Sequence, residues 1–388
     1  MNQGKYVFAQ ISAFLPQRIF DRMVAHHKGN YRVRHFSCWN QLLCMMFGQL
    51  SNRDSLSDLI VTIGAHGSKF YHLGFGKGVS KANLARANEV RDCRIYQLFS
   101  EHLIGLARQV CIRNDEGSFS FSNAVYAFDS TTIDLCLSVF CWATFRRAKA
   151  AVKLHTQYDV RTLIPVFIDV TAASQHDVKA MDKISYEPGS FYVFDRGYLD
   201  FKRLYLIHQS GSFFVIRARA NLQFQRRSSA VVDKTTGVRC DQIGVLTVFY
   251  SAKGYPEKIR RIKFYDTEQK RTFIFLTNNM ELKAQEIAAV YKHRWKVELF
   301  FKWIKQHLKV KAFWGYSENA VKTQVYIAVI TYTVVAIIKE KLKSEYSTYE
   351  ILQILGTSLL DKTPLNQLLR KKNNQDVKEL LSNQLKIF

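Results

Sequence analysis

The chain has 388 residues, of which 47% are hydrophobic, so it is long enough for two domains or for one domain with a large insertion. Lys and Arg total 56 against 32 Asp and Glu, and the resulting formal net charge of +24 favours a polyanionic partner, either nucleic acid or an anionic membrane surface. The seven cysteines are scattered and never spaced as C-x-x-C, which argues against a zinc site and a disulfide framework and favours reduced thiols in a cytoplasm.

Residues 1–115 are predicted to form a mostly helical DNA-binding region. Apolar residues repeat at helical spacing over 8–15 and 42–50, and Ser80 is expected to cap a helix that runs to Asn88. Basic residues lie between the apolar stripes, and a solvated helical face is the alternative to DNA binding for them. These residues are Arg32, Arg34, His35, Arg53, Lys81, Arg86, Arg91 and Arg94.

Residues 120–345 are predicted to form an α/β catalytic domain, which begins with alternating elements in the order β-β-β-α-β-α-β. Asp129 directly follows the first expected strand and Asp195 directly follows the fourth. A carboxylate at the end of an apolar strand is common at turns, so each one alone is weak evidence for a site. The expected strands are 124–128, 152–158, 164–170, 191–194 and 213–218, and the expected helices are 177–184 and 201–208.

Residues 219–280 are predicted to be a β-rich insertion, with strands at 246–250, 261–265 and 272–276. One long helix is expected to follow from Lys283 to Lys309. Five polar residues of that helix would fall within about 80° of one face at about 100° per residue, and the alternative is a solvated face with Glu–Lys pairing. They are Tyr291, Arg294, Glu298, Lys302 and Lys305.

The last part of the sequence is predicted to be helical. Its longest nearly apolar run, Val325–Ile338, has 14 residues, whereas a spanning helix needs roughly 20, so we expect a buried core helix and no membrane partner. Residues 346–388 are expected to be a helical basic tail with a cluster at 370–372. Because no cleavable leader opens the chain, the expected location is the cytoplasm, in association with a bacterial nucleoid.

Asp129, Asp195 and Glu298 are the candidate catalytic residues. Three acids that converge from two strands and a helix would form a hard-oxygen site for Mg²⁺ or Mn²⁺. Two such ions can activate the attacking oxygen and stabilise the leaving oxygen in a phosphoryl transfer. Near this site, Lys153 and His155 share a strand face, where a phosphate contact and a structural role are both open. Asp177 is expected to cap a helix.

The spacing Tyr291-x2-Arg294-x3-Glu298-x6-Lys305 resembles the Y-R-E-K signature of the DDE transposases of the insertion-sequence-four (IS4-like) group. Asp-Ser-Thr at 129 and Asp-Arg-Gly-Tyr at 195 resemble the two aspartate motifs of that group. The strand-rich stretch before Glu298 resembles its β insertion within an RNase H-like fold. The resemblance covers nearly the whole chain.

This resemblance implies a transposase with an RNase H-like catalytic core, which cleaves transposon ends and joins their 3′-hydroxyls to target DNA. Asp129, Asp195 and Glu298 would hold two Mg²⁺ or Mn²⁺ ions, and Tyr291, Arg294 and Lys305 would contact phosphates. Lys302 is added from the helix geometry alone. The implied partner is double-stranded DNA, at the inverted-repeat ends and at the target, with a homodimer in the synaptic complex. A structure-specific nuclease on the same fold and a non-catalytic DNA-binding derivative are the alternatives.

Overall fold

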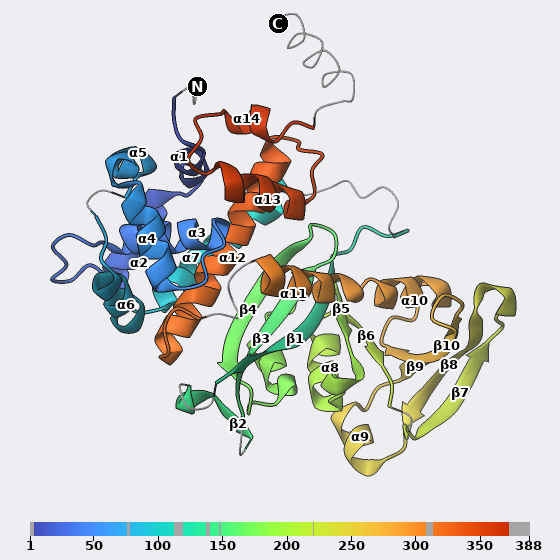
Figure 1. Ribbon diagram of the computed structural model, residues 1–388. Coiled ribbons are helices and arrows are strands. Elements are labelled where there is room, and N and C mark those ends of the chain that lie inside the picture. The colour runs from blue at the N-terminus through green and yellow to red at the C-terminus, as the bar shows by residue number, and fades with distance from the viewer. Residues whose placement is uncertain are drawn as a thin grey trace, which may run out of the picture. The chain divides into compact units, whose positions relative to one another are not determined.

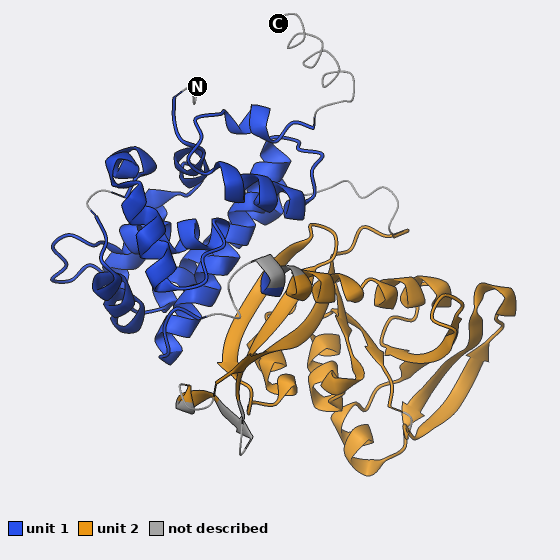
Figure 2. Cartoon of the chain, in the orientation of Figure 1, with its two compact units in different colours: residues 1–111, 303–388 blue, residues 112–302 orange. Residues whose placement is uncertain are grey.

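The computed structural model describes residues 4–75, 78–111, 119–136, 140–146, 149–219, 221–307 and 313–371. The chain forms two compact units (Figure 2). Unit 1 comprises residues 1–111 and 303–388, and unit 2 comprises residues 112–302. This division differs from the expected one, because α12 (Glu318–Lys341) and α13 (Thr348–Ser358) pack with the N-terminal helices. Of the basic tail expected over 346–388, residues 372–388 lie outside the described residues.

The sheet of unit 2 has the strand order β4-β3-β1-β5-β6 at its centre (Figure 1). β3 is antiparallel to both of its neighbours β1 and β4, whereas β1, β5 and β6 run parallel. This order and these directions are those of an RNase H-like sheet, which confirms the expected fold class. The strands are β1 (Val125–Leu135), β3 (Lys149–Asp159), β4 (Ile164–Ala172), β5 (Phe191–Phe194) and β6 (Phe213–Arg217), with the short β2 (Thr144–Arg146) beside β3.

The β-rich insertion extends this same sheet. Its last strand pairs with β6, so the order continues β6-β10-β9-β8-β7 with antiparallel neighbours. The strand expected at 246–250 is wrong, because β8 ends at Leu246 and a short helix follows. Polar residues and a glycine interrupt the apolar pattern of β8, so this strand was not predicted. The elements are β7 (Phe224–Ala230), η5 (Lys234–Thr236), β8 (Val238–Leu246), α9 (Phe249–Gly254), β9 (Ile259–Asp266) and β10 (Arg271–Thr277).

An aromatic core supports one face of the central strands. Tyr126 and Phe128 of β1 and Tyr192 and Phe194 of β5 are fully buried there, and the rings of Phe128 and Phe194 lie 5.8 Å apart. Alternate residues of a strand point to opposite faces. The residue after Phe128 and the residue after Phe194 therefore turn to the other face. The elements over the aromatic face are η3 (Asp177–Lys183), η4 (Arg196–Tyr198) and α8 (Phe201–Gln209).

Unit 1 is a bundle of helices built around α12 (Glu318–Lys341) (Figure 1). Ser80 accepts a hydrogen bond from the backbone N–H of Asn83, so it caps α6 as expected. The mostly helical character of the N-terminal region is confirmed. Its helices are α1 (Val7–Ser12), α2 (Gln17–His26), α3 (Cys38–Leu50), α4 (Leu56–Ala65), η1 (Gly67–Lys69), α5 (Phe70–Leu73), α6 (Lys81–Val90) and α7 (Arg94–Val110), and the C-terminal part adds α13 (Thr348–Ser358) and α14 (Leu365–Leu368).

By length and composition α12 could cross a membrane, but 94% of its most apolar window is buried inside the protein. Residues on all sides of the helix are buried, from Ala320 to Ile338, against α3, α6, α7 and α13. A helix that is hydrophobic all round belongs in the core of a protein or in a membrane. Its packing within unit 1 confirms that the run Val325–Ile338 is a buried core helix.

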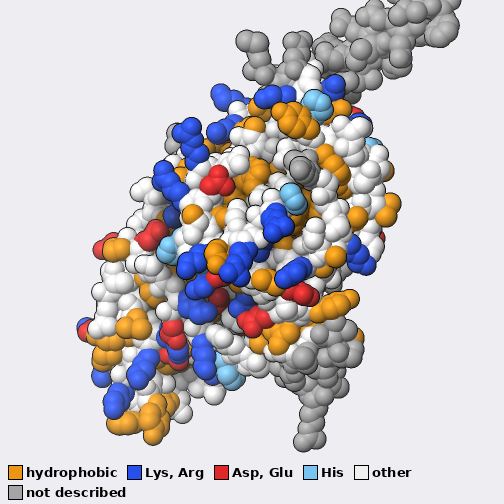
Figure 3. Space-filling model, turned by 90° about the vertical axis from the view of Figure 1, so that its left-hand side faces the viewer, with side chains coloured by type: hydrophobic (Ala, Val, Ile, Leu, Met, Phe, Trp, Pro, Cys, Tyr) orange, Lys and Arg blue, Asp and Glu red, His pale blue; other side chains and the backbone are white. Residues whose placement is uncertain are grey.

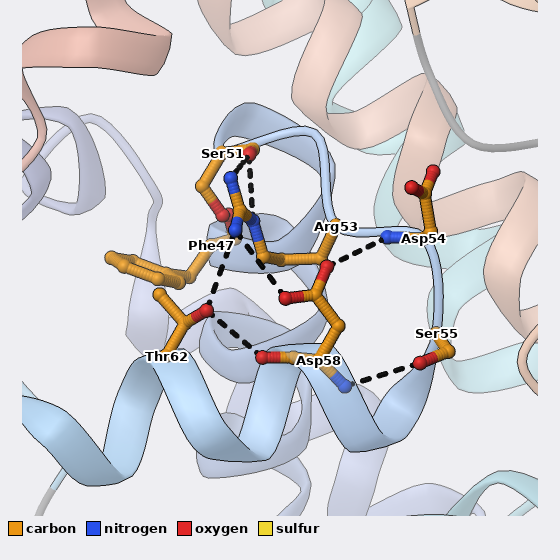
Figure 4. Close-up of polar contacts among 7 residues, drawn as sticks. All are labelled: Phe47, Ser51, Arg53, Asp54, Ser55, Asp58 and Thr62. Atoms are coloured by element: carbon orange, nitrogen blue, oxygen red, sulfur yellow. Dashed lines mark hydrogen bonds and ion pairs between the residues drawn. The ribbon is translucent and has the colours of Figure 1, made fainter.

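The turn between α3 and α4 is held by Arg53 (Figure 4). Its guanidinium donates to the carbonyl of Ser51 at 2.8 and 2.6 Å and pairs with Asp58 at 3.4 Å. Asp58 also accepts a hydrogen bond from the backbone of Asp54, and its own backbone N–H donates to the Ser55 cap of α4. Arg53, one of the basic residues considered for DNA contact, therefore has a structural role within unit 1.

Gly48 gives a test of how tightly this bundle is packed. It lies in α3, and a Cβ built on it would be 2.5 Å from the Trp314 ring. We expect Gly48→Ala to lower the free energy of unfolding by about 1–3 kcal/mol, because the added methyl overpacks the core. Gly105→Ala in α7 is the matched control, since a Cβ there meets nothing within 4 Å. That variant should gain up to about 1 kcal/mol from helix propensity. Equal effects of the two substitutions in urea unfolding would contradict this packing.

Candidate active site

The register of the parallel strands places Asp129 and Asp195 side by side. The paired row Phe128 to Phe194 is the last one shared by β1 and β5, and the two aspartates are the next residue on each strand. Both follow an aromatic anchor and therefore turn to the face opposite the aromatic core. The sequence predicted that the first strand ends at Asp129. This is wrong, because β1 continues to Leu135 through pairing with β3 alone. Asp195 directly follows β5 as expected.

The long helix expected over 283–309 is two helices. α10 (Ala284–Lys292) and α11 (Trp295–His307) are separated by a turn at His293 and Arg294. Tight i to i−3 hydrogen bonds mark the turn, from Arg294 to Tyr291 and from Val297 to Arg294. No Gly or Pro lies here, so the sequence contained no signal for a break. The prediction that the five polar residues share one face of a single helix is therefore wrong.

Apolar contacts dock α11 on the face that carries the two aspartates. Val297 is fully buried, and the Phe300 ring lies 5.3 Å from that of Tyr158 on β3. Lys296 donates to the backbone carbonyl of Val160 at 3.1 Å. Because these residues fix one side of α11 to the sheet, Glu298 and Leu299 are left exposed on the other. Glu298 thus lies on a helix that is fixed to the sheet, and its carboxylate is open to solvent.

Arg294 brings the site together. Its guanidinium pairs with Asp129 through Nη1 at 2.7 Å and with Glu298 through Nη2 at 2.5 Å. The Tyr291 hydroxyl donates to Asp195 at 3.4 Å. The structure therefore joins all three candidate acids through two of the candidate phosphate-binding residues. On α11, Lys302 is exposed and Lys305 is half-buried.

Burial controls the charge of this cluster. It raises the pKa of Asp129 to about 6; the Arg294 guanidinium opposes the rise, and Glu298 and Asp195 add to it. Burial also lowers the pKa of Arg294, but Asp129, Tyr291 and Glu298 raise it further, so the guanidinium stays charged. Acids that raise one another's pKa need a cation between them, and Arg294 supplies one. Within the described part of the chain, no three metal-binding side chains are already gathered around a common point.

The raised pKa of Asp129 predicts a pH dependence of stability. The folded chain holds this proton to about pH 6, and the unfolded chain loses it near 3.8. Folding stability should therefore be greatest at low pH for this group and fall as pH rises from about 4 to 6, by up to about 3 kcal/mol. Asp129→Asn cannot ionise, so in EDTA it should melt increasingly above the wild type over that range. A constant difference between the two proteins would contradict the assignment.

A second polar network lies on the aromatic face, directly behind Asp129. The Ser130 backbone N–H donates to Asp129 at 2.8 Å, and the Ser130 hydroxyl donates to Asp177 at 2.8 Å. Asp177 also pairs with Lys153 at 3.1 Å. The N-cap position of η3 is His176, and Asp177 is the first residue of the helix, so the expectation that Asp177 caps a helix is wrong. His155 is fully buried and bonds Thr171 at 3.0 Å, which is a structural role.

A cleft of about 610 Å³ opens beside the acids, between α10 and the insertion strands. Tyr291 and Arg294 line one side, with Trp295, whose side chain is half exposed. Arg271 stacks on the Phe273 ring at 4.3 Å on the other. The cleft thus continues from the catalytic candidates along a cationic and aromatic wall. Arg271 was not among the predicted site residues, since a basic residue at the start of a strand carries no pattern of its own.

Two family models match the chain. One, described as the Transposase DDE domain, matches residues 121–334, and the other, described as a domain of unknown function (DUF4372), matches residues 3–76. The first contains β1 with Asp129, the residue after β5 and the helix with Glu298. It covers more than half of the chain.

Three curated relatives also match. A putative transposase, y4zB, of Sinorhizobium fredii is 34% identical over 213 residues, 54% of this chain and 59% of the relative. A probable transposase for insertion sequence element IS5377 of Geobacillus stearothermophilus is 27% identical over 63% of this chain and 64% of the relative. A putative transposase for IS4SA of Synechocystis is 23% identical over 74% and 77%. The chain thus spans less than two thirds of the first two relatives. Its match to the family model shows that it belongs to the Transposase DDE domain family.

Proposed function

We propose that the protein is a DNA transposase that cleaves transposon ends and joins the freed 3′-hydroxyls to target DNA. One observation carries the proposal: parallel register sets Asp129 beside Asp195, and Arg294 links Asp129 to Glu298. Asp129 and Glu298 share the partly buried charge of Arg294, and Asp195 lies beside Asp129, so the three carboxylates form a set of hard oxygen donors. The family model and the three relatives support the same activity.

Asp129, Asp195 and Glu298 would hold two Mg²⁺ or Mn²⁺ ions. The donors fit such ions, because they are carboxylate oxygens and because burial, with Glu298 and Asp195 adding to it, raises the pKa of Asp129, which a bound cation would oppose. When bound, the ions supply activation of the attacking oxygen and stabilisation of the leaving oxygen. Bound cations would also release Arg294 from the acids. The backbone N–H of Ser130 would still hold Asp129 in place.

Arg294, freed from Glu298, would contact the phosphates of the cleaved end together with Tyr291 and Lys305. A guanidinium matches phosphate in a bidentate fork, whereas Lys305 would act as a point charge. Lys302 is exposed on the same helix and would extend the contact. The partners proposed are the inverted-repeat ends and the target duplex, with two copies of the chain in the synaptic complex. A bacterial cytoplasm, in contact with the nucleoid, is the proposed location.

The test is incubation of the full chain with labelled end-containing duplex and a target plasmid, in Mg²⁺ or Mn²⁺. Nicked ends followed by plasmid-joined products are expected. Cleavage at branched or random sites with no joined product would show a structure-specific nuclease. DNA binding with no cutting in either metal would show a derivative that has lost its chemistry. Either result would refute the proposal.

A further inference from the structure

A second groove lies in unit 1. The loop between α2 and α3 and the outer face of α6 enclose about 610 Å³. Residues of the loop fall in the stretch matched by the domain of unknown function. Lys and Arg side chains gather on the face of the molecule drawn in Figure 3. The basic residues that line the groove are Lys28, Arg32, Arg34, Arg86 and the largely buried Arg91, with His27 and His35.

The charge of this groove is not neutralised. Lys28, Arg32, Arg34 and Arg86 are exposed, and none forms an ion pair with a described residue. Asp92 is the acid among the lining residues, and it already pairs with Arg94 at 2.5 Å and with His27 at 3.3 Å. Four cations around one hollow repel one another unless an anion lies between them. The groove is therefore suited to a polyanion.

The loop is held in a fixed shape. Arg91 is 9% exposed and donates to the backbone carbonyls of Ser37, at 2.9 Å, and Phe36. The Asn30 side chain accepts a hydrogen bond from the backbone N–H of Cys38 at 2.8 Å. A Cβ on Gly29 would come within 2.5 Å of Ile95, so the base of the loop packs tightly on α7. Arg91 thus has a structural role, because it holds the loop that carries the exposed basic residues of the groove.

Two of the cations stand on strained backbone. Lys28 has φ 52° and Arg32 has φ 56°, a left-handed conformation that disfavours residues other than glycine by about 1–2 kcal/mol. Strain of this kind is retained where the surroundings enforce it, and it clusters at binding sites. The Arg32 guanidinium also lies 5.1 Å from the ring of Tyr31, which is 68% exposed. The backbone therefore fixes the direction of these side chains before any ligand arrives.

We propose that this groove binds the backbone phosphates of duplex DNA through Arg32, Arg34 and Arg86, with Lys28 at its edge. Guanidinium groups recognise phosphates in bidentate fashion, and contacts of Arg and Lys with phosphates position a protein on the duplex. The proposal rests on the proposed function, because that function identifies duplex DNA as the polyanion. It gives the N-terminal region a defined contact with DNA, separate from the contacts of Arg294 and Lys305.

The experiment measures affinity of the full chain for end-containing duplex across a series of salt concentrations, in EDTA so that nothing is cut. The test variant is Arg32→Gln with Arg34→Gln, and Arg86→Gln is measured alone. The matched control is Arg18→Gln with Arg22→Gln, which removes the same charge from exposed positions of α2 outside the groove. Melting temperatures report on folding, and Arg32→Lys with Arg34→Lys retains the charge without the fork.

We expect the groove double variant to bind about tenfold or more weakly and to lose about two units of the log–log salt slope, one for each phosphate contact. The control variant should retain most of the DNA affinity and most of the salt slope. The variant with Arg32→Lys and Arg34→Lys should have the wild-type salt slope but only part of the wild-type affinity. Equal losses in groove and control variants would show a general charge effect and overturn the proposal.

Two further outcomes separate this proposal from the proposed function. If the wild type cuts and joins DNA but the groove variants keep its DNA affinity and salt slope, the proposal for the groove is overturned and the proposed function is not. Wild type with no affinity for duplex DNA would overturn both. Variants that bind DNA normally but lose binding to phosphatidylserine vesicles would assign the groove to a membrane surface, which also contradicts the proposal.

Discussion

Asp129→Asn, Asp195→Asn and Glu298→Gln are each expected to abolish DNA cleavage, with a fall in rate of about 1,000-fold or more. Each change keeps the size of the side chain and removes one anionic oxygen donor. Loss of several kcal/mol of transition-state stabilisation from a metal site corresponds to this factor, since about 1.4 kcal/mol is tenfold. Single-turnover cleavage of end-containing duplex measures it, and gel shifts on the same preparations should show DNA binding largely retained.

The matched control is Asp134→Asn. It lies on β1 five residues after Asp129, is exposed, and faces the opposite side of the sheet by alternation. Its cleavage rate should equal that of the wild type. Asp129→Asn should also melt above the wild type at neutral pH in EDTA, because burial of the Asp129 charge destabilises the fold. An inactive variant that is more stable cannot be explained by misfolding. Normal cutting by any of the three acid variants would remove that residue from the site.

Arg294→Gln is expected to lower stability and cleavage together, but only stability should recover with metal. Without ions, the change leaves the buried charge of Asp129 without its cation, which destabilises by about 3 kcal/mol, whereas Asp129→Asn removes that charge and leaves Arg294 paired with Glu298. Mn²⁺ at about 100 times its dissociation constant should restore about 2.7 kcal/mol. Cleavage should stay about 100-fold or more below wild type, because the phosphate contact is still missing.

Lys305→Gln is the companion variant. Lys305 lies seven residues from Glu298 on α11, about 10 Å along a helix, so it should not stabilise the acids. We expect a loss of about one unit of salt slope, with no recovery of DNA affinity when Mn²⁺ is added. If Arg294→Gln lost stability that Mn²⁺ did not restore, while DNA affinity and slope stayed at wild-type values, Arg294 would be a structural residue and the phosphate role would be wrong.

The elements nearest the acids were predictable from the sequence. Apolar runs bounded by polar residues identified β5 at 191–194 without error and placed β3, β4, β6 and α8 within a few residues. Asp129 and Asp195 were identified because a carboxylate interrupts an apolar strand in both places. The apolar run in α12 correctly predicted a core helix, but its length does not decide this, because α12 as a whole is long enough to cross a membrane and only its burial in the bundle shows its role.

Features that depend on tertiary contacts were not predictable. The break between α10 and α11 has no Gly or Pro, and it coincides with the ion pairs that Arg294 makes with two other elements. Nothing local shows that β10 pairs with β6 or that the C-terminal helices join the N-terminal bundle. Arg53 and Arg91 look like surface charges in the sequence, yet both donate to backbone carbonyls within unit 1. Basic composition alone cannot separate such residues from Arg32 and Arg34.

The most direct test of the central claim is a change of metal preference. Asp129→Cys and Asp195→Cys replace a hard oxygen donor by a softer thiolate, which Mn²⁺ accepts more readily than Mg²⁺. Cleavage of end-containing duplex by each variant is measured in Mg²⁺ and in Mn²⁺, beside wild type and Asp134→Cys. We predict that the two variants are inactive in Mg²⁺ and recover part of the wild-type rate in Mn²⁺, while Asp134→Cys follows the wild type in both. Full activity in Mg²⁺ for either variant, or losses that are the same in the two metals, would contradict direct binding of the catalytic ions by these carboxylates.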